Sequence, residues 1–202
     1  MNKKFGFVSL TGRTNVGKST LLNSLFGKKI AITSRKPQTT RNRILGIFSE
    51  NNNQIVFLDT PGVHSGFKRA LNKYMNRVAR NCYEEVDLVI FVVDRGRWQK
   101  EEENILKNLK ELNKPIFLVI NKIDRKDARP KEVIDEVFDL FVALGATDEQ
   151  LDFPILYASG RDGWSVKELD HPKENLHSLL DLMLKHVPSP KVELDKPFAM
   201  LS

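Results

Sequence analysis

Short apolar runs alternate along the chain with segments of helical period, and each run ends in a polar or glycine-containing turn. This alternation is typical of a parallel sheet whose strands are connected by crossover helices. The apolar runs predict six strands, over residues 5–10, 43–48, 54–58, 87–93, 115–120 and 154–157. Apolar side chains at helical spacing predict helices over residues 20–26, 68–81, 101–112, 130–144 and 174–187.

Only about five polar residues, Glu50 to Gln54, separate the second and third predicted strands, so we expect these strands to form a hairpin. The expected fold class is α/β, with three layers: a mainly parallel six-stranded sheet, one antiparallel edge strand, and helices on both faces. The last helical pattern stops at Pro188, which places one domain over residues 1–188. We interpret residues 189–202 as a linker or as the start of a following domain.

The composition of the 202 residues, 41% hydrophobic and 29% charged, supports a folded core and excludes disorder over most of the length. The net charge of +6 hides an asymmetry, because residues 1–124 carry 22 basic and 11 acidic side chains, and residues 125–202 carry 10 and 15. The basic half indicates a polyanionic partner, either nucleic acid or phosphate groups. A solvated basic surface would give the same count, so both interpretations stay open.

Cysteine content and hydropathy bear on the compartment of the protein. Cys82 is the only cysteine, so the chain forms no intrachain disulfide and no cysteine-based metal cluster. The longest apolar run, residues 88–93, is far shorter than the roughly 20 residues of a membrane span. The N-terminus has no apolar stretch of the kind found in signal peptides. We therefore expect a cytoplasmic, monomeric protein without a transmembrane segment.

The strongest chemical signal lies between the first strand and the first helix, where residues 12–19 fit the pattern G-x-x-x-x-G-K-[ST]. A loop of this kind wraps backbone N–H groups around phosphates, and the helix N-terminus adds partial positive charge. Lys18 would reach the β- and γ-phosphates, and the Ser19 hydroxyl would ligate Mg²⁺. The predicted nucleotide-binding residues of this loop are Gly12, Asn15, Val16, Gly17, Lys18, Ser19 and Thr20.

Three further motifs each follow a predicted strand. In Asp59-Thr60-Pro61-Gly62, the carboxylate can hold Mg²⁺ and the Gly62 N–H can sense a γ-phosphate. The other two motifs are Asn121-Lys122-Ile123-Asp124 and the loop Ala158-Ser159-Gly160. Each is a weak signal alone, since polar residues at strand ends are usually turns or caps. Because all of them follow strands, in one order, they predict a single nucleotide site at the carboxyl edge of the sheet.

The last two motifs indicate that the base is guanine. The Asp124 carboxylate can accept hydrogen bonds from the guanine N1–H and exocyclic amine, and adenine offers no such pair. A site built on such bonds can reject the analogue that lacks them by roughly 10⁴–10⁵. The aliphatic part of Lys122 can cover the face of the base, and backbone N–H groups of Ala158, Ser159 and Gly160 can donate to the guanine O6.

Together the motifs resemble those of the P-loop GTPases related to translation factors. The first part of the chain, residues 1–124, resembles the Era family of bacterial ribosome-assembly GTPases, through residues 12–19, 32–41, 59–64 and 88–94. The second part, residues 121–202, resembles the BipA/TypA family of ribosome-binding GTPases, through residues 121–125, 127–130, 135–141, 146–154, 157–159 and 186–190. Both resemblances and the change in charge meet near residues 121–125, so we interpret the chain as a chimera of two homologous GTPase domains.

The resemblance implies a protein that binds GTP and GDP and hydrolyses GTP to GDP and phosphate, as a slow switch of the ribosome-associated type. It implies that the catalytic residues are Lys18, Thr40 and Gly62. It implies further that Mg²⁺ is held by Ser19, Thr40 and Asp59.

The resemblance also bears on GTP hydrolysis at two positions, and at one position the sequence differs from the usual Era residue. Asn15 is the residue that would help to place a potassium ion against the phosphates. Val63 stands where many GTPases have a glutamine that orients the attacking water, so hydrolysis is expected to be slow. Gly160 stands where Era proteins usually carry alanine, which leaves the backbone donor in place.

Era proteins bind ribosomal RNA, so the resemblance implies the ribosome or its RNA as a partner. They do so largely through a C-terminal KH domain, and no Gly-x-x-Gly loop follows residue 163 here, which weakens this expectation. Two alternatives stay open. One is an RNA-binding module that uses the acid-free basic stretch within residues 28–43, and the other is a nucleotide-binding scaffold without significant turnover.

Overall fold

The computed structural model describes residues 4–27, 43–59, 86–95, 99–112 and 114–189. In these ranges the helices are α1 (Lys18–Phe26), α3 (Lys100–Lys110), α4 (Pro130–Ala143), α5 (Asp148–Leu151) and α6 (His177–His186). One seven-stranded sheet contains β1 (Phe5–Thr11), β2 (Arg43–Glu50), β3 (Asn53–Asp59), β4 (Leu88–Asp94), β5 (Ile116–Asn121), β6 (Ile155–Ser159) and β7 (Trp164–Val166).

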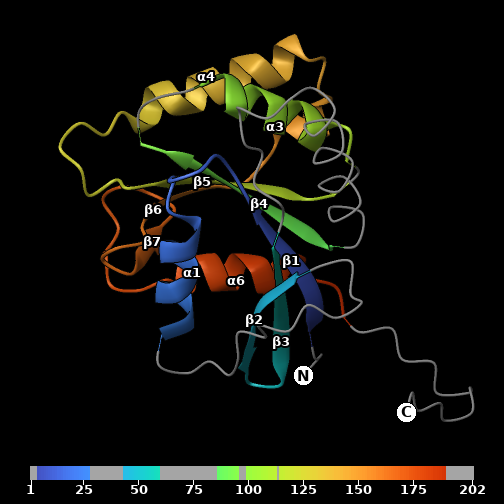
Figure 1. Cartoon of the computed structure of the whole chain (residues 1–202), viewed down its shortest axis with the longest axis vertical. Helices are drawn as coiled ribbons and strands as arrows, with labels where there is room; N and C mark the ends of the chain where they lie inside the picture. The colour runs from blue at the N-terminus through green and yellow to red at the C-terminus, as the bar shows by residue number, and fades with distance from the viewer. Residues whose placement is uncertain (1–3, 28–42, 60–85, 96–98, 113, 190–202) are drawn as a thin grey trace, which may run out of the picture.

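The strands lie in the order β2-β3-β1-β4-β5-β6-β7 (Figure 1). From β3 to β6 each strand runs parallel to its neighbour, whereas β2 and β7 are antiparallel at the two edges. The α/β class and the mainly parallel sheet are therefore confirmed. The prediction of six strands with one antiparallel edge is wrong by one strand. β7 has only three residues, too few to produce an alternating pattern in the sequence.

The other differences from the predicted elements are small. Helix α5 is a single turn of four residues and, like β7, is too short to show a period. The helix predicted over residues 68–81 lies outside the described residues. No helix in the described ranges is both long enough and apolar enough to cross a bilayer.

The predicted hairpin between β2 and β3 is confirmed, and its turn is tighter than the sequence suggests. β2 ends at Glu50 and β3 begins at Asn53, so two residues make the turn. Both of them, Asn51 and Asn52, have positive φ values, 48° and 65°. Asparagine tolerates this left-handed region, and two such residues in succession give the turn whose twist matches paired antiparallel strands.

Helices cover both faces of the sheet, with α1 and α6 on one side and α3 and α4 on the other (Figure 1). Each face has its own core, because side chains of a strand point alternately to opposite faces. Val8, Phe57 and Phe117 contribute to the core under α1 and α6. Val89 and Phe141 belong to the core under α3 and α4. Both cores combine residues from before and after residue 124, so the two parts of the chain fold as one body.

The parallel arrangement determines where the motifs meet. The register pairs Leu10 with Asp59, Asp94 with Asn121, and Asn121 with Ala158. These residues end, or nearly end, neighbouring strands, so the loops that follow emerge at the same edge of the sheet. Open parallel sheets bind their ligands at this carboxyl edge.

Two phenylalanines of α4 provide a test of the core. Phe141 is 2% exposed, whereas Phe138 is 44% exposed on the same helix. We expect Phe141→Ala to lower the free energy of unfolding by about 3–5 kcal/mol, because it removes a buried ring and leaves a cavity. Phe138→Ala, the matched control, should change it by less than about 1 kcal/mol. Urea unfolding followed by circular dichroism measures both, and equal losses would contradict the packing described here.

Candidate nucleotide-binding site

Residues 12–19 connect β1 to α1 through a loop with an unusual backbone. Three of them have positive φ values: Gly12 at 146°, Asn15 at 63° and Gly17 at 98°. Left-handed residues next to right-handed ones turn successive N–H groups toward one side, which forms a concavity that suits anions. The loop therefore has the conformation that the sequence pattern requires for binding phosphate.

Both glycines are required by close contacts as well as by φ. A Cβ at Gly12 would lie 2.1 Å from the carbonyl oxygen of Val92 in β4, and a Cβ at Gly17 would lie 2.3 Å from Nδ2 of Asn121. No side chain fits at these distances. The loop is thus packed tightly between the ends of β4 and β5.

Lys18 begins α1 and folds back over the loop. Its ammonium group donates hydrogen bonds to the carbonyl oxygens of Gly12 at 2.6 Å and Arg13 at 2.7 Å. The positive charge is therefore held at the centre of the concavity, next to the N-terminus of α1. Both features favour an anion at this place.

The Asn121 side chain connects the phosphate loop to the loop after β6. Its Nδ2 donates to the carbonyl oxygen of Val16 at 2.8 Å, and its Oδ1 accepts from the N–H of Gly160 at 2.9 Å. The residue is 1% exposed. The sequence predicts the Gly160 N–H as a donor to guanine, but in this structure that group donates to Asn121.

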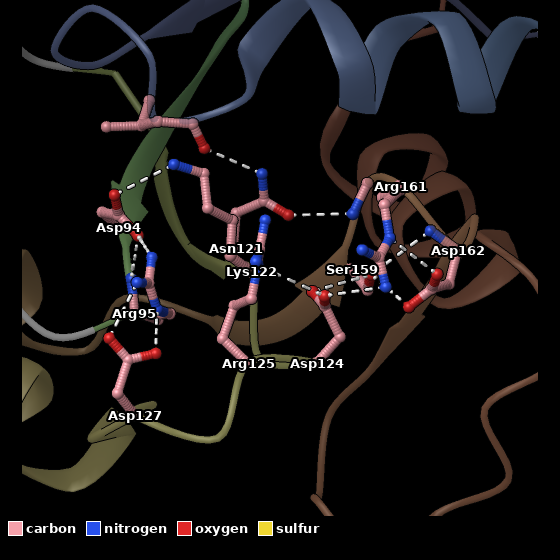
Figure 2. Close-up of polar contacts among 12 residues, drawn as sticks. Asp94, Arg95, Asn121, Lys122, Asp124, Arg125, Asp127, Ser159, Arg161 and Asp162 are labelled. Atoms are coloured by element: carbon pink, nitrogen blue, oxygen red, sulfur yellow. Dashed lines mark hydrogen bonds and ion pairs between the residues drawn. The ribbon is translucent and has the colours of Figure 1, made fainter.

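Lys122 has a left-handed backbone, with φ at 65°, and its side chain lies across the loop. Its ammonium donates to the carbonyl oxygen of Asn15 at 2.6 Å and to Asp94 at 3.0 Å. Asp94 also accepts from Arg95, which forms two hydrogen bonds with Asp127, at 2.7 and 2.8 Å. Figure 2 shows this chain of alternating charges running away from Lys122. These contacts hold Lys122 in a backbone conformation that residues other than glycine rarely adopt.

The ion pair between Arg95 and Asp127 shifts the pKa of both groups. The hydrogen bond from Arg95 lowers the pKa of the Asp127 carboxyl below its usual range. The hydrogen bond to Asp127 likewise raises the pKa of Arg95, so both groups are charged at neutral pH. Because Asp127 is largely exposed, water screens the pair and its main effect is to orient Arg95.

Asp124 lies on the other side of Lys122, with its carboxylate contacted by Ser159, Arg161 and Arg125 (Figure 2). Ser159 Oγ donates to Oδ1 at 3.0 Å, and Arg161 lies 3.4 Å from Oδ2. Ser159 Oγ also lies 2.8 Å from Asp162, and since a hydroxyl has one proton, the two carboxylates share it. The bonds from Ser159 and Arg161 lower the pKa of Asp162. Asp124 is therefore in direct contact with the end of β6 and with the loop that follows it.

Two hollows lie side by side at this edge. One of 270 Å³ is lined by Asn15, Gly17, Lys18, Ser19, Thr20 and Lys122. The other, of 210 Å³, is lined by Gly17, Thr20, Asn121, Lys122, Asp124, Arg125 and Arg161. They share Gly17, Thr20 and Lys122, so the lysine side chain forms a common wall. The first contains the predicted phosphate ligands and the second contains the predicted base ligands.

The structure brings together most of the residues that the sequence predicts for the site. Ser19 and Thr20 lie in the first turn of α1, and Ala158 and Ser159 end β6 beside Asn121. Asp59 ends β3, next to β1. Thr40 and Gly62 lie outside the described residues. Among the described residues no group of three or more His, Cys, Asp or Glu side chains is arranged to hold a metal ion.

Four residues of the site are missed by the sequence prediction: Asp94, Arg95, Asp127 and Arg161. Asp94 ends a strand as Asp59 and Asn121 do, and this position could have revealed it. Arg95, Asp127 and Arg161 act through pairs whose partners are distant in the sequence or in a turn, so no local pattern marks them.

Close packing explains why residue 160 is glycine, and this packing cannot be seen in the sequence. A Cβ at this position would lie 3.0 Å from the backbone nitrogen of Leu21 and 3.1 Å from its Cα. The Ser24 hydroxyl also donates a hydrogen bond to the Gly160 carbonyl. The glycine therefore allows α1 to pack close against the loop after β6.

Comparison with known proteins agrees with this geometry. The family model described as "50S ribosome-binding GTPase" matches residues 7–122, more than half of the chain. The chain belongs to this GTPase family, and it is of the Era type. GTPase Era of Pseudomonas putida (strain W619) is 42% identical over 184 residues, which cover 91% of the chain and 55% of that protein. GTPase Era of Coxiella burnetii (strain Dugway 5J108-111) is 48% identical over 138 residues, 67% of the chain and 46% of that protein.

Solved Era structures share the fold of this Era-type domain. An Era variant from Aquifex aeolicus, bound to GDP and AlF4⁻, has a TM-score of 0.62 and 36% identity, over 93% of this chain and 58% of its own. Era in complex with MgGDPNP and nucleotides 1506–1542 of 16S ribosomal RNA has a TM-score of 0.66 and 35% identity, over 96% of this chain and 63% of its own. The chain thus spans about half the length of the curated Era relatives that it matches.

The comparisons give no support to a BipA/TypA segment or to a chimera. The alignment with Era of P. putida leaves at most 18 residues unaligned, far fewer than the 78 that follow Asp124. Era-type sequence therefore accounts for most of the second part of the chain as well as the first. The change in charge near residues 121–125 therefore lies within a stretch that aligns with a single relative.

The Asn121 bridge provides a test of the site. We expect Asn121→Ala to lower the free energy of unfolding by about 2–4 kcal/mol, because it leaves the Val16 carbonyl and the Gly160 N–H without a partner. Asn104→Ala, an exposed asparagine of α3, is the control and should change it by less than about 0.5 kcal/mol. Chemical denaturation without nucleotide measures both, and a neutral Asn121→Ala would disprove the structural role of the bridge.

Proposed function

We propose that this domain binds GTP and GDP and hydrolyses GTP slowly, as a molecular switch. The observation that carries the proposal is the Asn121 bridge, which holds the phosphate loop at Val16 and the base-selecting loop at Gly160. The two adjoining hollows then fit the two ends of one ligand, the phosphates and the base. Membership of the GTPase family supports the same ligand.

Guanine is proposed as the base because of the position of Asp124. Its side chain is 11% exposed at the edge of the base hollow, and Ser159 holds one of its oxygens. A carboxylate oriented in this way accepts from the N1–H and amine of guanine, whereas adenine presents an acceptor at N1. Arg161, which is 67% exposed and lies on the other oxygen, must yield that oxygen to the base. An exposed ion pair of this kind contributes little and is easily displaced.

Lys18 and the N-terminus of α1 are proposed to bind the phosphates. The Lys18 ammonium already lies among loop carbonyls at 2.6 and 2.7 Å, and needs only to turn toward an incoming β–γ oxygen. Water then attacks the γ-phosphate in line, while Lys18 and the loop N–H groups stabilise the charge that develops on the leaving oxygen. Thr40 and Gly62 belong to this proposal from the sequence alone.

A magnesium ion fits the donor chemistry of the site. The hydroxyl of Ser19 lies in the phosphate hollow, and Asp59 ends the neighbouring β3. Mg²⁺ usually keeps several waters and takes one or two protein oxygens together with substrate phosphates, so a small protein donor set suits it. When bound, the ion neutralises charge on the β- and γ-phosphates. The proposed ligands are Ser19 and Asp59 with Thr40, and Asn15 is the proposed contact of a potassium ion.

Base selection is tested by calorimetric titration with GDP and with ATP. We expect GDP to bind at least 10³-fold more tightly than ATP, because adenine does not offer Asp124 the adjacent pair of donors that guanine does. Asp124→Asn should lose most of this preference, whereas Asp181→Asn, an exposed aspartate of α6, should keep it. Equal affinity of the unchanged protein for the two nucleotides would contradict the assignment of guanine as the bound base.

Turnover is tested by phosphate release from GTP in Mg²⁺, with K⁺ or Na⁺ as the monovalent cation. We expect a rate of about 10⁻⁴–10⁻³ s⁻¹ without a partner, as for unassisted GTPases. Lys18→Ala should lower it at least tenfold, since this cation lies where the charge develops. A faster rate in K⁺ than in Na⁺ would support the role of Asn15. Tight GDP binding without any phosphate release would instead support the scaffold alternative.

The partner of the whole protein is proposed from its relatives. One solved Era contains a segment of 16S ribosomal RNA, and the family model names the 50S subunit. We therefore propose that the ribosome or its RNA is the partner, and that residues 1–188 form the GTPase domain, with residues 189–202 as a connection. RNA retention that persists in Lys18→Ala would favour binding independent of the nucleotide site.

A further inference from the structure

Glu102 is a fully buried carboxylate in the first turn of α3. The residue is 0% exposed, although it lies on a helix whose neighbouring side chains are mainly polar. Its Oε2 accepts from the N–H of Gln99 at 2.7 Å, and its Oε1 accepts from Nε of Arg13 at 3.4 Å. One carboxylate oxygen thus accepts a hydrogen bond from the backbone N–H of Gln99 at the start of the helix. The other accepts a hydrogen bond from Arg13 in the phosphate loop.

Arg13 is the second residue of the phosphate loop, and its two ends have different partners. The side chain, 18% exposed, pairs with Glu102, while the backbone carbonyl accepts from the Lys18 ammonium at 2.7 Å. A movement of Arg13 would therefore move one of the two carbonyls that hold Lys18. Glu102, Arg13 and Lys18 form a continuous chain of contacts from α3 to the proposed phosphate ligand.

A buried, charged carboxylate such as that of Glu102 is not expected at this position if its only role is to stabilise the fold. Burial raises the pKa of its carboxyl above the ordinary value, against the opposing effects of Arg13 and of the Gln99 N–H. A carboxylate whose pKa is raised in the folded state lowers stability as the pH increases through that pKa. The Gln99 N–H needs only a neutral acceptor, which glutamine would supply. The negative charge also suits the start of the helix, and the described group of opposite charge that it pairs with is Arg13.

We propose that Glu102 is a positioning residue for the phosphate loop, acting through Arg13 to hold the loop open around the phosphates. This inference rests on the proposed function, since it concerns how tightly that site holds a diphosphate. It concerns only the phosphate end of the ligand. The base end is held by Asn121, Lys122 and Asp124, none of which contacts Glu102 or Arg13 in the described hydrogen bonds and ion pairs.

The test compares GDP with guanosine, which lacks phosphates, in Glu102→Gln. Glutamine keeps the shape and the acceptor for Gln99 but loses the charge that faces Arg13. We expect the affinity for GDP to fall about tenfold, while the affinity for guanosine, measured by competition with a fluorescent GDP analogue, stays within twofold. Arg13→Ala should show the same selective loss. The double variant should lose no more than the larger single loss, because both changes break one contact.

Two controls separate positioning from damage to the fold. Glu103→Gln, in the same helical turn but only partly buried, should leave both affinities unchanged. The free energy of unfolding of Glu102→Gln should be equal to or higher than that of the unchanged protein, because a buried charge is removed. Unchanged GDP affinity in Glu102→Gln, or equal losses for GDP and guanosine, would overturn the inference. Failure of the unchanged protein to bind GDP would instead overturn the proposed function, and is seen before any variant is made.

Discussion

The side-chain amide of Asn121 is the contact on which the rest of the site depends. It is the one group in the described residues that bonds to both the phosphate loop, at Val16, and the loop after β6, at Gly160. Gly17 has no side chain because this amide occupies the space where a Cβ would be. An amide can serve both loops because it has a donor and an acceptor in fixed geometry, and neither aspartate nor leucine of similar size offers that pair. The base and phosphate hollows share their walls as a result.

Two residues with left-handed backbones lie near this contact, and hydrogen bonds and an ion pair hold them there. Asn15 and Lys122 both have left-handed backbones, and the bond between the Lys122 ammonium and the Asn15 carbonyl joins them. Such conformations persist only where neighbouring contacts determine them. Asp94 provides the second anchor of Lys122, and Arg95 in turn orients Asp94. Rigid ends of β4 and β5 therefore hold a loop that would not keep this shape alone.

The sequence predicts those parts of the fold and the site that depend on local chemistry. The phosphate loop is recognisable because its glycines, lysine and serine are all within residues 12–19, and each long strand shows as an apolar run. β7 and α5 were missed because three or four residues carry no period. The Arg95–Asp127 and Arg13–Glu102 pairs join residues 32 and 89 positions apart, so only the folded chain reveals them. The chimera interpretation is wrong for a related reason. Short sequence motifs do not show over how many residues the chain aligns with one family.

The net charge of the first part of the chain says little about the site itself. Residues 28–42 and 60–85, outside the described ranges, contain ten basic and two acidic side chains, which is most of the excess before residue 125. At the carboxyl edge of the sheet several of the described cations are paired with carboxylates: Lys122 and Arg95 with Asp94, Arg95 with Asp127, and Arg161 with Asp124. Pairs a few ångströms apart cancel at the distance of a Debye length, about 8 Å at physiological salt. Among the described residues, phosphate attraction at this edge therefore comes mainly from Lys18, the loop N–H groups and the start of α1. These act only at contact distance, so the described residues of this edge select a phosphate by fit.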